Sequence, residues 1–188
     1  MAQQQNILIL CGSLRQGSFN RKLANSAQEL APPNMRFSEA PPIGDIPHYN
    51  ADVQNSEGFP PQVVALAEAV AAADGVLIVS PEYNFSVPGV LKNAIDWVSR
   101  QPEQPFRGKP VALQSAAGGL LGGARSQYHM RQIMVFLEAQ VFTKPEVFVT
   151  FAAKKFDEGT GRLSDEATRD AVAAQLKAFS DFVARMNG

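Results

Sequence analysis

The sequence is poor in residues that bind metals and form disulfides. Its 188 residues include a single cysteine, Cys11, and only two histidines, His48 and His129. One cysteine cannot form a disulfide within the chain, and two separated histidines argue against a zinc site. We therefore expect no metal.

The sequence also lacks the features of membrane proteins and nucleic-acid-binding proteins. No apolar run reaches the roughly 20 residues that span a bilayer. The first residues, MAQQQN, lack the charged and apolar regions of a signal peptide. The formal net charge of -1 gives no reason to expect nucleic acid or an anionic membrane as a partner. We expect a cytoplasmic protein.

What the sequence does contain is a regular series of short apolar runs. Hydrophobic residues make up 45% of the chain, which suits one domain covering residues 1–188. Continuous apolar runs are typical of strands that are buried on both faces. The predicted buried strands are Asn6–Cys11, Gly75–Ser80, Pro110–Ala116 and Glu146–Phe151. A fifth segment, Met35–Ala40, alternates between apolar and polar residues and is predicted as an edge strand.

Amphipathic segments separate these strands and predict helices. The predicted helices are Asn20–Leu30, Pro61–Ala73, Pro88–Arg100, Ala124–Ala139 and a last helix that follows Ser164 as its N-cap. The apolar face of that last helix comprises Val172, Leu176, Phe179, Val183 and Met186. The segment Ala40–Gln62 is rich in Pro, Gly and Asn and is predicted as one long loop.

Alternating strands and helices predict an α/β fold with a parallel sheet covered on both faces. Five such units favour a flavodoxin-like three-layer sandwich, with a five-stranded parallel sheet of order 2-1-3-4-5 and helices on both faces. In such a sheet, ligands bind beyond the carboxyl ends of the strands, at the switch point between strands 1 and 3.

The loop after the first strand, CGSLRQGSFNR, lacks two residues that a nucleoside-triphosphate site needs. Gly12 and Gly17 have the spacing of that motif, but Ser18 and Phe19 stand where it has lysine and a magnesium-binding hydroxyl. The loop still carries Ser13, Arg15, Ser18 and Asn20 at the start of a predicted helix. Such donors suit one phosphate bound without a metal. The alternative is a capped loop with solvated arginines.

Two further loops lie at the same predicted edge of the sheet. After the third strand, Tyr83, Asn84 and Phe85 would suit a planar ring attached to a phosphate. The segment Ser115–Arg125 follows the fourth strand, and its four glycines allow a flat ligand to approach the backbone. The alternatives are aromatic residues that pack on the core and a merely flexible connection.

Three segments carry a resemblance to a known family. CGSLRQGSFNRKLA, PEYNFSVPGVLKNAIDW and GKPVALQSAAGGLLGGARSQYHMRQ resemble the NAD(P)H-dependent FMN reductase family, most closely its quinone and chromate reductase branch. The resemblance covers essentially the whole chain, including KKFD at Lys154–Asp157.

The resemblance implies a set of residues around FMN. Those around its phosphate and ribityl chain are Ser13, Arg15, Ser18, Phe19 and Asn20. Those along the isoalloxazine ring are Pro81, Glu82, Tyr83, Asn84 and Phe85. Those at the polar edge of the ring are Ser115, Ala117, Gly118 and Gly119. Relatives commonly have serine where this chain has Ala117, so only the backbone N–H is expected to serve there.

The same resemblance implies the reaction. NAD(P)H would reduce FMN, and FMN would pass two electrons to a quinone or another small acceptor, including chromate, with ping-pong kinetics. The hard chemistry belongs to the cofactor, so no catalytic side chain is expected. Arg125 could bind anionic acceptors or NADPH phosphate, or could be an interface or solvated arginine.

Two alternative functions stay open at the level of sequence. A flavodoxin-type electron carrier would bind FMN without oxidising NAD(P)H itself, although such carriers tend to be strongly acidic. An esterase using a loop serine such as Ser13 would be unrelated, and no G-x-S-x-G elbow is present in the sequence.

Two helices have more apolar surface than one core face needs. In Ala124–Ala139 one face comprises Met130, Ile133, Met134 and Leu137, with Val141 beyond it, and Tyr128 and Val135 lie opposite. In Pro88–Arg100, Trp97 lies toward the edge of the apolar side. This surplus suggests partner helices, and the resemblance adds a homodimer that often pairs into tetramers. The alternative is two helices fully buried in one subunit.

Overall fold

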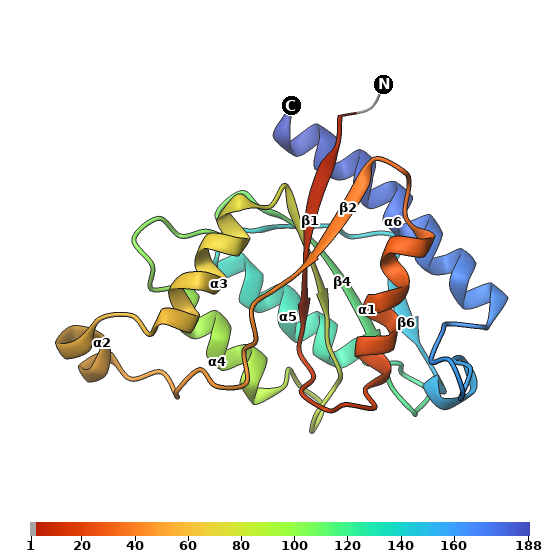
Figure 1. Cartoon of the computed structure of the whole chain (residues 1–188), viewed down its shortest axis with the longest axis horizontal. Coiled ribbons are helices and arrows are strands. Elements are labelled where there is room, and N and C mark those ends of the chain that lie inside the picture. Colours follow the sequence, from red (N-terminus) through yellow and green to blue (C-terminus); the bar gives the residue numbers. More distant parts are fainter. Residues whose placement is uncertain (1–2) are drawn as a thin grey trace.

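A parallel sheet forms the centre of the protein, whose computed structural model describes residues 3–188 (Figure 1). The strands are β1 (Gln5–Cys11), β2 (Met35–Glu39), β3 (Gly75–Val79), β4 (Pro110–Ala116), β5 (Gln140–Val141) and β6 (Val147–Val149). Their order is β2-β1-β3-β4-β5, with β6 also paired to β4, and every pairing is parallel. The predicted flavodoxin-like order is confirmed, and β2 is the edge strand.

The far edge of the sheet is divided between two short strands. β5 pairs with Pro110 and Val111 at the start of β4, and β6 pairs with Gln114, Ser115 and Ala116 at its end. The prediction of one strand over Glu146–Phe151 is therefore correct only for Val147–Val149. β5 has only two residues, which are too few to show an apolar pattern in the sequence.

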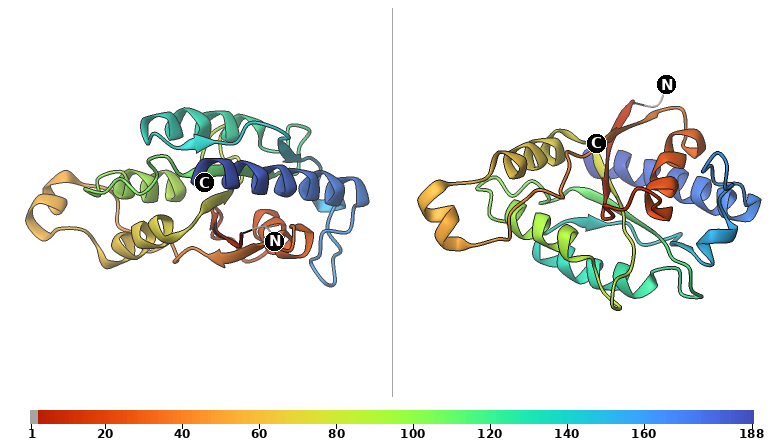
Figure 2. Two further views of the ribbon diagram at one scale, coloured as in Figure 1. Left: turned by 90° about the horizontal axis from the view of Figure 1, so that it is seen from above. Right: turned by 60° about the horizontal axis from the view of Figure 1, so that its bottom comes forward.

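Helices cover both faces of the sheet. α1 (Phe19–Leu30) and α6 (Glu166–Asn187) cover one face, and α3 (Pro61–Ala72), α4 (Gly89–Val98) and α5 (Ala124–Phe136) cover the other (Figures 1 and 2). Alternate residues of β1 serve the two layers, because Leu8 and Leu10 pack with α3–α5 while Ile7 and Ile9 pack with α1 and α6. Burial of each such side chain stabilises the fold by roughly 1.5–3 kcal/mol.

The last helix begins one residue later than the sequence suggests. Asp165, not Ser164, is the N-cap of α6, and its carboxylate accepts from the backbone N–H of Thr168 at 3.0 Å. The hydroxyl of Ser164 instead donates to the carbonyl of Lys155. Hydrogen bonds from Thr168 and Lys155 lower the pKa of Asp165 to about 2. Met186 is exposed and does not belong to the buried face of this helix.

The segment Ala40–Gln62 is not one irregular loop. It contains the helix α2 (Ala51–Glu57), capped by Asn50, whose side chain accepts from the N–H of Asp52 at 2.9 Å. Asn is a preferred N-cap residue, and that signal was present in the sequence. In Figure 1, α2 lies at the far end of the molecule from α6.

The same segment covers Trp97 and corrects the expectation that this residue adds partner surface. Trp97 is fully buried, and its indole N–H donates to the carbonyl of Pro47 at 2.8 Å. The rings of Tyr49 and Phe59 lie edge-on to it, with centroids 5.0 and 6.2 Å away. The apolar surplus of α4 is therefore covered within the subunit.

None of the helices over residues 3–188 is long and apolar enough to cross a bilayer. Within the same residues, no group of three or more His, Cys, Asp or Glu side chains is placed to hold a metal ion.

Candidate functional site

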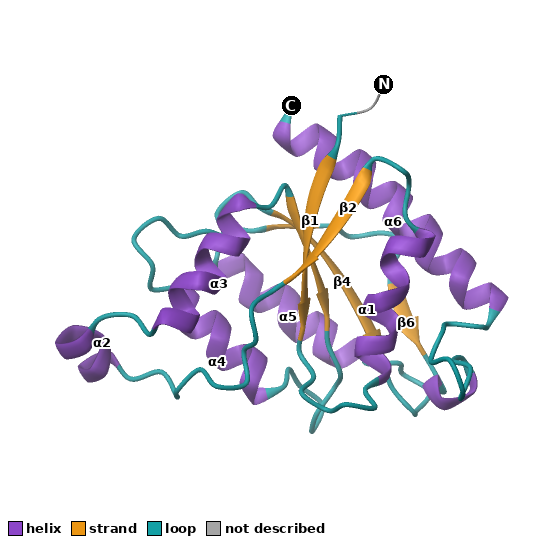
Figure 3. Cartoon of the chain, in the orientation of Figure 1, coloured by secondary structure: helices purple, strands orange, loops and turns teal. Residues whose placement is uncertain are grey.

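Three loops meet at the carboxyl ends of β1, β3 and β4. The strands point toward the same edge in Figure 3, and the right view of Figure 2 brings that edge forward. The loops enclose a cavity of about 220 Å³, called here the flavin cavity after the cofactor that the family resemblance implies. It is lined by Ser13, Arg15, Ser18, Phe19, Asn20, Pro81, Glu82, Tyr83, Ala116, Ala117 and Gly118. Asn84, Phe85, Ser115 and Gly119 lie outside this lining.

The loop between β1 and α1 presents hydrogen-bond donors to the cavity. Ser18 caps α1 by accepting from the N–H of Arg21 at 3.3 Å. The N–H groups of Phe19 and Asn20 and the hydroxyl of Ser13 have no partner within residues 3–188. With the positive end of the α1 dipole, these groups form an anion site that needs no metal.

Arg15 adds a positive charge beside this anion site. The side chain is exposed, donates to the carbonyl of Gly17 at 3.1 Å, and lies 6.0 Å from the ring centroid of Phe19. No acidic partner is paired with Arg15 within residues 3–188. Its charge is therefore available to a phosphate.

Asn20 has a structural role within the site. Its amide donates to the carbonyl of Ala116 and accepts from the N–H of the same residue, both at 2.9 Å. The side chain is buried and joins the start of α1 to the end of β4. Asn20 can therefore offer a ligand its backbone N–H, while its amide fixes the separation of two loops.

The loop after β3 is a tight hairpin. Tyr83 and Ser86 exchange two backbone hydrogen bonds, at 3.0 and 2.9 Å, across Asn84 and Phe85. Both central residues have positive φ, 49° and 66°, as a two-residue hairpin turn requires. A phenylalanine in this region is an uncommon, strained choice, and such strain concentrates at functional sites.

Glu82 connects this hairpin to the start of α5. Its carboxylate is buried and accepts from the backbone N–H groups of Arg125 and Ser126 and from the Arg125 guanidinium, with Nε at 2.7 Å. The same guanidinium lies 3.5 Å above the ring centroid of Phe85. Glu82 and Arg125 thus hold the second and third loops together. Nothing in the sequence indicates that these two residues pair.

Ser115 supports the third loop from below. It is fully buried; its hydroxyl donates to the carbonyl of Gly122 at 2.7 Å and accepts from Gln127 at 2.8 Å. A Cβ on Gly123 would lie 2.6 Å from the Ser115 Cβ, so only glycine fits there. The hydroxyl of Ser115 is therefore occupied within the protein.

Gly118 and Gly119 face open space. A Cβ on either would have no neighbour within 4 Å, and their N–H groups have no partner among residues 3–188. A flat ligand can approach this backbone closely and receive hydrogen bonds from it.

One residue that the motif analysis did not assign supports the site from outside the cavity lining. Phe156, in the segment KKFD, stacks on Phe19 with ring centroids 5.8 Å apart. The Lys22 ammonium also lies over the Phe19 ring, 5.8 Å from its centroid. The similarity of KKFD to the family was the available signal, but sequence spacing could not show which loop it reaches.

Neither cysteine nor histidine chemistry is built into the cavity. Burial raises the pKa of the Cys11 thiol, so it is not an activated nucleophile. His129 shares a 2.9 Å hydrogen bond with Ser86, and neither histidine is hydrogen-bonded to Ser13. The esterase alternative therefore lacks a base at its proposed serine.

These features define a class of protein: a flavodoxin-like fold with an anion-binding donor set at the start of α1, beside an aromatic hairpin and an open glycine backbone. That donor set fits FMN, whose phosphate suits the α1 start and whose ring has a polar edge for backbone N–H groups. The sequence model of the family described as NADPH-dependent FMN reductase matches residues 5–154. The chain belongs to this family and is an NAD(P)H-dependent FMN oxidoreductase.

Individual relatives agree with this assignment. The chain is 52% identical over 186 residues to a quinone reductase of Escherichia coli K12, covering 99% of each chain. It is 47% identical to an NAD(P)H-dependent FMN reductase of Pseudomonas aeruginosa, covering 100% of each. The solved structure of a flavoenzyme NAD(P)H:(acceptor) oxidoreductase, FerB of Paracoccus denitrificans, matches with a TM-score of 0.87 at 32% identity, covering 97% of this chain and 98% of that one.

Proposed function

We propose that the chain reduces quinones with electrons from NAD(P)H, using FMN held at the flavin cavity. The observation that carries the proposal is the convergence of the β1, β3 and β4 loops on one cavity, with unpaired N–H groups and Arg15 on one side and an aromatic hairpin and open glycine backbone on the other. FMN, when bound, supplies the hydride-accepting and electron-donating chemistry. The quinone reductases among the relatives support a quinone as the acceptor.

The residues divide into two groups around FMN. The phosphate is held by the N–H groups of Phe19 and Asn20, the Ser13 hydroxyl and the Arg15 guanidinium. Charge-assisted hydrogen bonds to a phosphate are about twice as strong as neutral ones, which makes this the tighter half of the site. Ser18 contributes by capping α1 and keeping those N–H groups in place.

The ring of FMN extends beyond the enclosed part of the site. A volume of about 220 Å³ is below the roughly 300–1,000 Å³ of cavities that enclose whole ligands. The ring would lie along Pro81, Glu82 and Tyr83, with Asn84 and Phe85 at the hairpin tip. Its polar edge would receive the N–H groups of Gly118 and Gly119, with Ala117 beside them. One side of the ring would stay open for the nicotinamide and then for the acceptor.

Arg125 belongs to the rim of this open side. Its charge is paired with Glu82, yet 40% of the side chain remains exposed. The proposed role is twofold: Arg125 positions the hairpin and attracts anionic acceptors, chromate included, or the phosphate of NADPH.

A homodimer, possibly paired into a tetramer, completes the proposal. Large apolar side chains are exposed on the two ring-side loops and on α5. They are Tyr83, Phe85, Leu120, Leu121, Tyr128, Val135 and Phe136. Exposed apolar side chains of this kind, on the loops around an incompletely enclosed ligand and on the helix that follows, are typical of an interface. A cytoplasmic location stays part of the same proposal, since Cys11 has no second cysteine to pair with.

Steady-state kinetics with purified, FMN-loaded protein test this function. NAD(P)H and a soluble benzoquinone are varied together, and parallel double-reciprocal lines are expected because both substrates use the same open side. Absence of NAD(P)H oxidation would instead indicate the flavodoxin-type electron carrier. Intersecting lines would mean that both substrates bind at once and would contradict a shared binding face.

A further inference from the structure

Most polar side chains around the ring-side loops are already hydrogen-bonded within the protein. The Glu82 carboxylate accepts from the backbone N–H groups of Arg125 and Ser126 and from the Arg125 guanidinium. The hydroxyl of Ser126 donates to the carbonyl of Pro81 at 3.2 Å, and the hydroxyl of Ser115 donates to Gly122. These groups fix the loops, so their hydroxyl protons and carboxylate oxygens are not free for a substrate.

The Tyr83 hydroxyl is different, because it has no hydrogen-bond partner within residues 3–188. The other two tyrosines are bonded: the hydroxyls of Tyr49 and Tyr128 lie 3.2 and 3.4 Å from side-chain oxygens of Gln54 and Glu146. Tyr83 lines the flavin cavity and is 48% exposed, so it stands at the mouth of that cavity.

Other free donors lie near the ring side but outside the cavity lining. The Asn84 amide has no partner within residues 3–188, and the Arg125 guanidinium keeps N–H groups that Glu82 does not use. Neither residue lines the flavin cavity. Tyr83 is therefore the one ring-side residue of that lining whose side chain offers an uncommitted donor.

The backbone on either side of this hydroxyl is fixed. The N–H and the carbonyl of Tyr83 both bond to Ser86, at 3.0 and 2.9 Å. The preceding carboxylate, that of Glu82, ties the hairpin to the start of α5. A donor held in place by such contacts needs no rearrangement when a charge develops beside it, which is the property that makes a hydrogen bond effective in catalysis.

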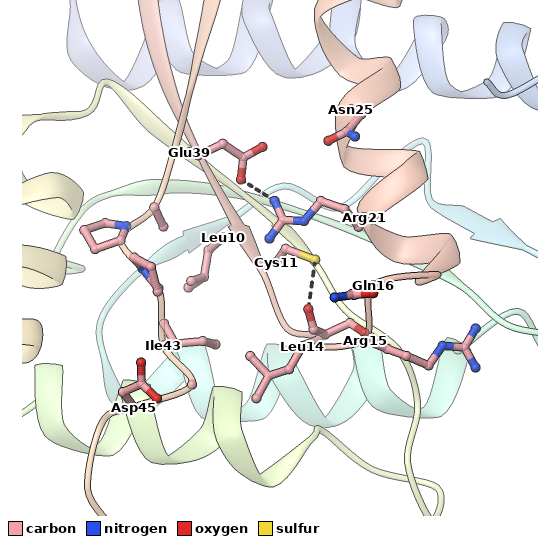
Figure 4. A pocket seen from close by; sticks show the side chains of 15 residues that line it. Leu10, Cys11, Leu14, Arg15, Gln16, Arg21, Asn25, Glu39, Ile43 and Asp45 are labelled. Carbon is pink, nitrogen blue, oxygen red and sulfur yellow. Dashed lines mark hydrogen bonds and ion pairs between the residues drawn. The ribbon is translucent and has the colours of Figure 1, made fainter. Parts of the chain in front are cut away.

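A larger cavity on the other side of the β1–α1 loop offers no comparable group to the ring side. Its volume is about 680 Å³, and its lining comes from residues 10–25 and 39–45, with none from the hairpin or the glycine loop. Its cation Arg21 is paired with Glu39 across one side of the cavity (Figure 4). A donor to an acceptor at the FMN ring must therefore come from the flavin cavity.

Quinone reduction creates a charge that such a donor can stabilise. A quinone that takes up a hydride, which NAD(P)H has given to FMN, becomes a hydroquinone anion with its negative charge on oxygen. A proton from solvent then completes the hydroquinone, and NAD(P)⁺ is the oxidised product. A hydrogen-bond donor beside that oxygen lowers the barrier, because the charge is larger in the transition state than in the neutral quinone.

We propose that the Tyr83 hydroxyl is a catalytic hydrogen-bond donor to the reacting oxygen of the acceptor. This inference rests on the proposed function. The phenol ring would lie along FMN, as the family resemblance implies, and the hydroxyl would contact the acceptor while keeping its own proton. The proposal adds a catalytic side chain where the sequence led us to expect none.

Two acceptors of different chemistry test this role in Tyr83→Phe, which removes the hydroxyl and keeps the ring. FMN-loaded protein that NADH has reduced is mixed with benzoquinone or with ferricyanide, and reoxidation is followed by stopped-flow absorbance. With benzoquinone the rate constant should fall about 10- to 100-fold, the loss of one hydrogen bond to a charged oxygen. Ferricyanide takes single electrons and develops no oxyanion, so its rate constant should be unchanged.

Binding provides a readout that is independent of turnover. The ionised form of a fluorinated phenol carries the same oxyanion as the hydroquinone anion. Calorimetry should show that oxidised, FMN-loaded parent binds it about tenfold more tightly than Tyr83→Phe. FMN affinity should be equal in the two proteins. Tyr49→Phe is the matched control, because it removes a hydroxyl outside the flavin cavity, and it should leave all of these quantities unchanged.

A loss confined to benzoquinone and the phenolate supports the inference. Equal benzoquinone rates in parent and Tyr83→Phe overturn it, and so does an equal loss with both acceptors. A weaker affinity of Tyr83→Phe for FMN also overturns it, because the hydroxyl would then contact the cofactor. A parent protein that binds FMN but reduces no quinone would overturn the proposed function itself, and the role of Tyr83 with it.

Discussion

The two sides of the flavin cavity are built in opposite ways. On the phosphate side, residues 12–20, the helix start is capped by Ser18 and fixed to β4 by the buried amide of Asn20. On the ring side, residues 81–85 and 117–125, the aromatic and aliphatic side chains of Tyr83, Phe85 and Leu120 are exposed. The phosphate side is fixed by contacts within the protein, and the ring side presents side chains that the rest of residues 3–188 leaves largely exposed.

The difference reflects the separate requirements of binding a phosphate and binding a ring. A phosphate needs fixed donors at a fixed spacing, and hydrogen bonds between buried groups supply them. The FMN ring has to meet NAD(P)H and then the acceptor, so one side of the ring needs to stay open. The loops beside the ring are therefore fixed by contacts within the protein, from Glu82, Arg125 and Ser115, while their outer surface stays exposed. The substitutions below test this contrast.

The largest effect is expected inside the ring-side loop, from the same substitution at two glycines. Gly123→Ala should lower the free energy of unfolding by about 3 kcal/mol, because φ is +93° and the new Cβ would overlap Ser115. Gly118→Ala should change it by less than about 0.5 kcal/mol, because nothing lies within 4 Å. Urea unfolding of both flavin-free variants measures the difference.

FMN affinity, unlike stability, should be sensitive to the substitution at Gly118. Gly118→Ala is expected to weaken FMN binding, because the new methyl group occupies the space left for the ring. Normal FMN affinity in the Gly118→Ala variant would show that the ring does not lie against this backbone.

The next effect concerns the phosphate side. Arg15→Ala should weaken FMN binding about 10- to 100-fold, the loss of one charge-assisted contact. Riboflavin, which lacks the phosphate, should bind equally to variant and parent, as measured by fluorescence titration. Arg36→Ala, at an exposed arginine of β2, is the control and should leave both affinities unchanged. An unaltered FMN affinity in Arg15→Ala would make Arg15 a solvated arginine.

A smaller effect is expected on α5, the helix that starts at the ring-side loop. Val135 is 76% exposed, so Val135→Glu should leave the fold of one subunit intact. At a dimer interface the same charge would be buried without a partner, and sedimentation at micromolar concentration should show a shift toward monomer. Quinone reduction at fixed flavin occupancy should fall with it.

A matched substitution controls this experiment. Met186→Glu changes an exposed apolar residue on α6, far from the hairpin, and should leave assembly and activity unchanged. A Val135→Glu variant that becomes monomeric with full activity would break the link between assembly and the open side. One that stays oligomeric would show that Val135 does not face a partner.

The smallest effect lies away from the cavity, at the start of α6. The pKa of Asp165 is lowered to about 2 from an ordinary 3.8, so its charge stabilises the fold above about pH 4, and that contribution is lost as pH falls through 2. Asp165→Asn keeps a capping oxygen and removes the charge. The difference in urea midpoint between parent and variant should therefore shrink between pH 4 and 2. A difference that is constant with pH would show that the charge contributes nothing.

The sequence predicts the sheet better than it predicts the contacts. Continuous apolar runs identified β1, β3 and β4 because buried parallel strands leave no polar face. Trp97 was misread, because the residues that cover it, Tyr49 and Phe59, come from a segment without a periodic pattern.

The candidate site shows the same contrast between what the sequence predicts and what only the structure shows. The convergence of three loops follows from the strand order, and ten of the residues implied by the family resemblance line the flavin cavity. The sequence does not show which polar groups are already hydrogen-bonded within the protein. The amide of Asn20, the hydroxyl of Ser115 and the carboxylate of Glu82 bond to groups that are distant in the chain, and only the folded structure brings them together.

Anaerobic titration of the FMN-loaded protein with NAD(P)H is the most direct test of flavin-dependent oxidoreduction at this cavity. One equivalent of FMN per chain should be retained, its visible absorbance should be bleached by one equivalent of NAD(P)H, and addition of benzoquinone should restore it. Retained FMN whose absorbance NAD(P)H leaves unchanged would contradict the account and indicate an electron carrier; a chain that retains no flavin would contradict the cavity itself.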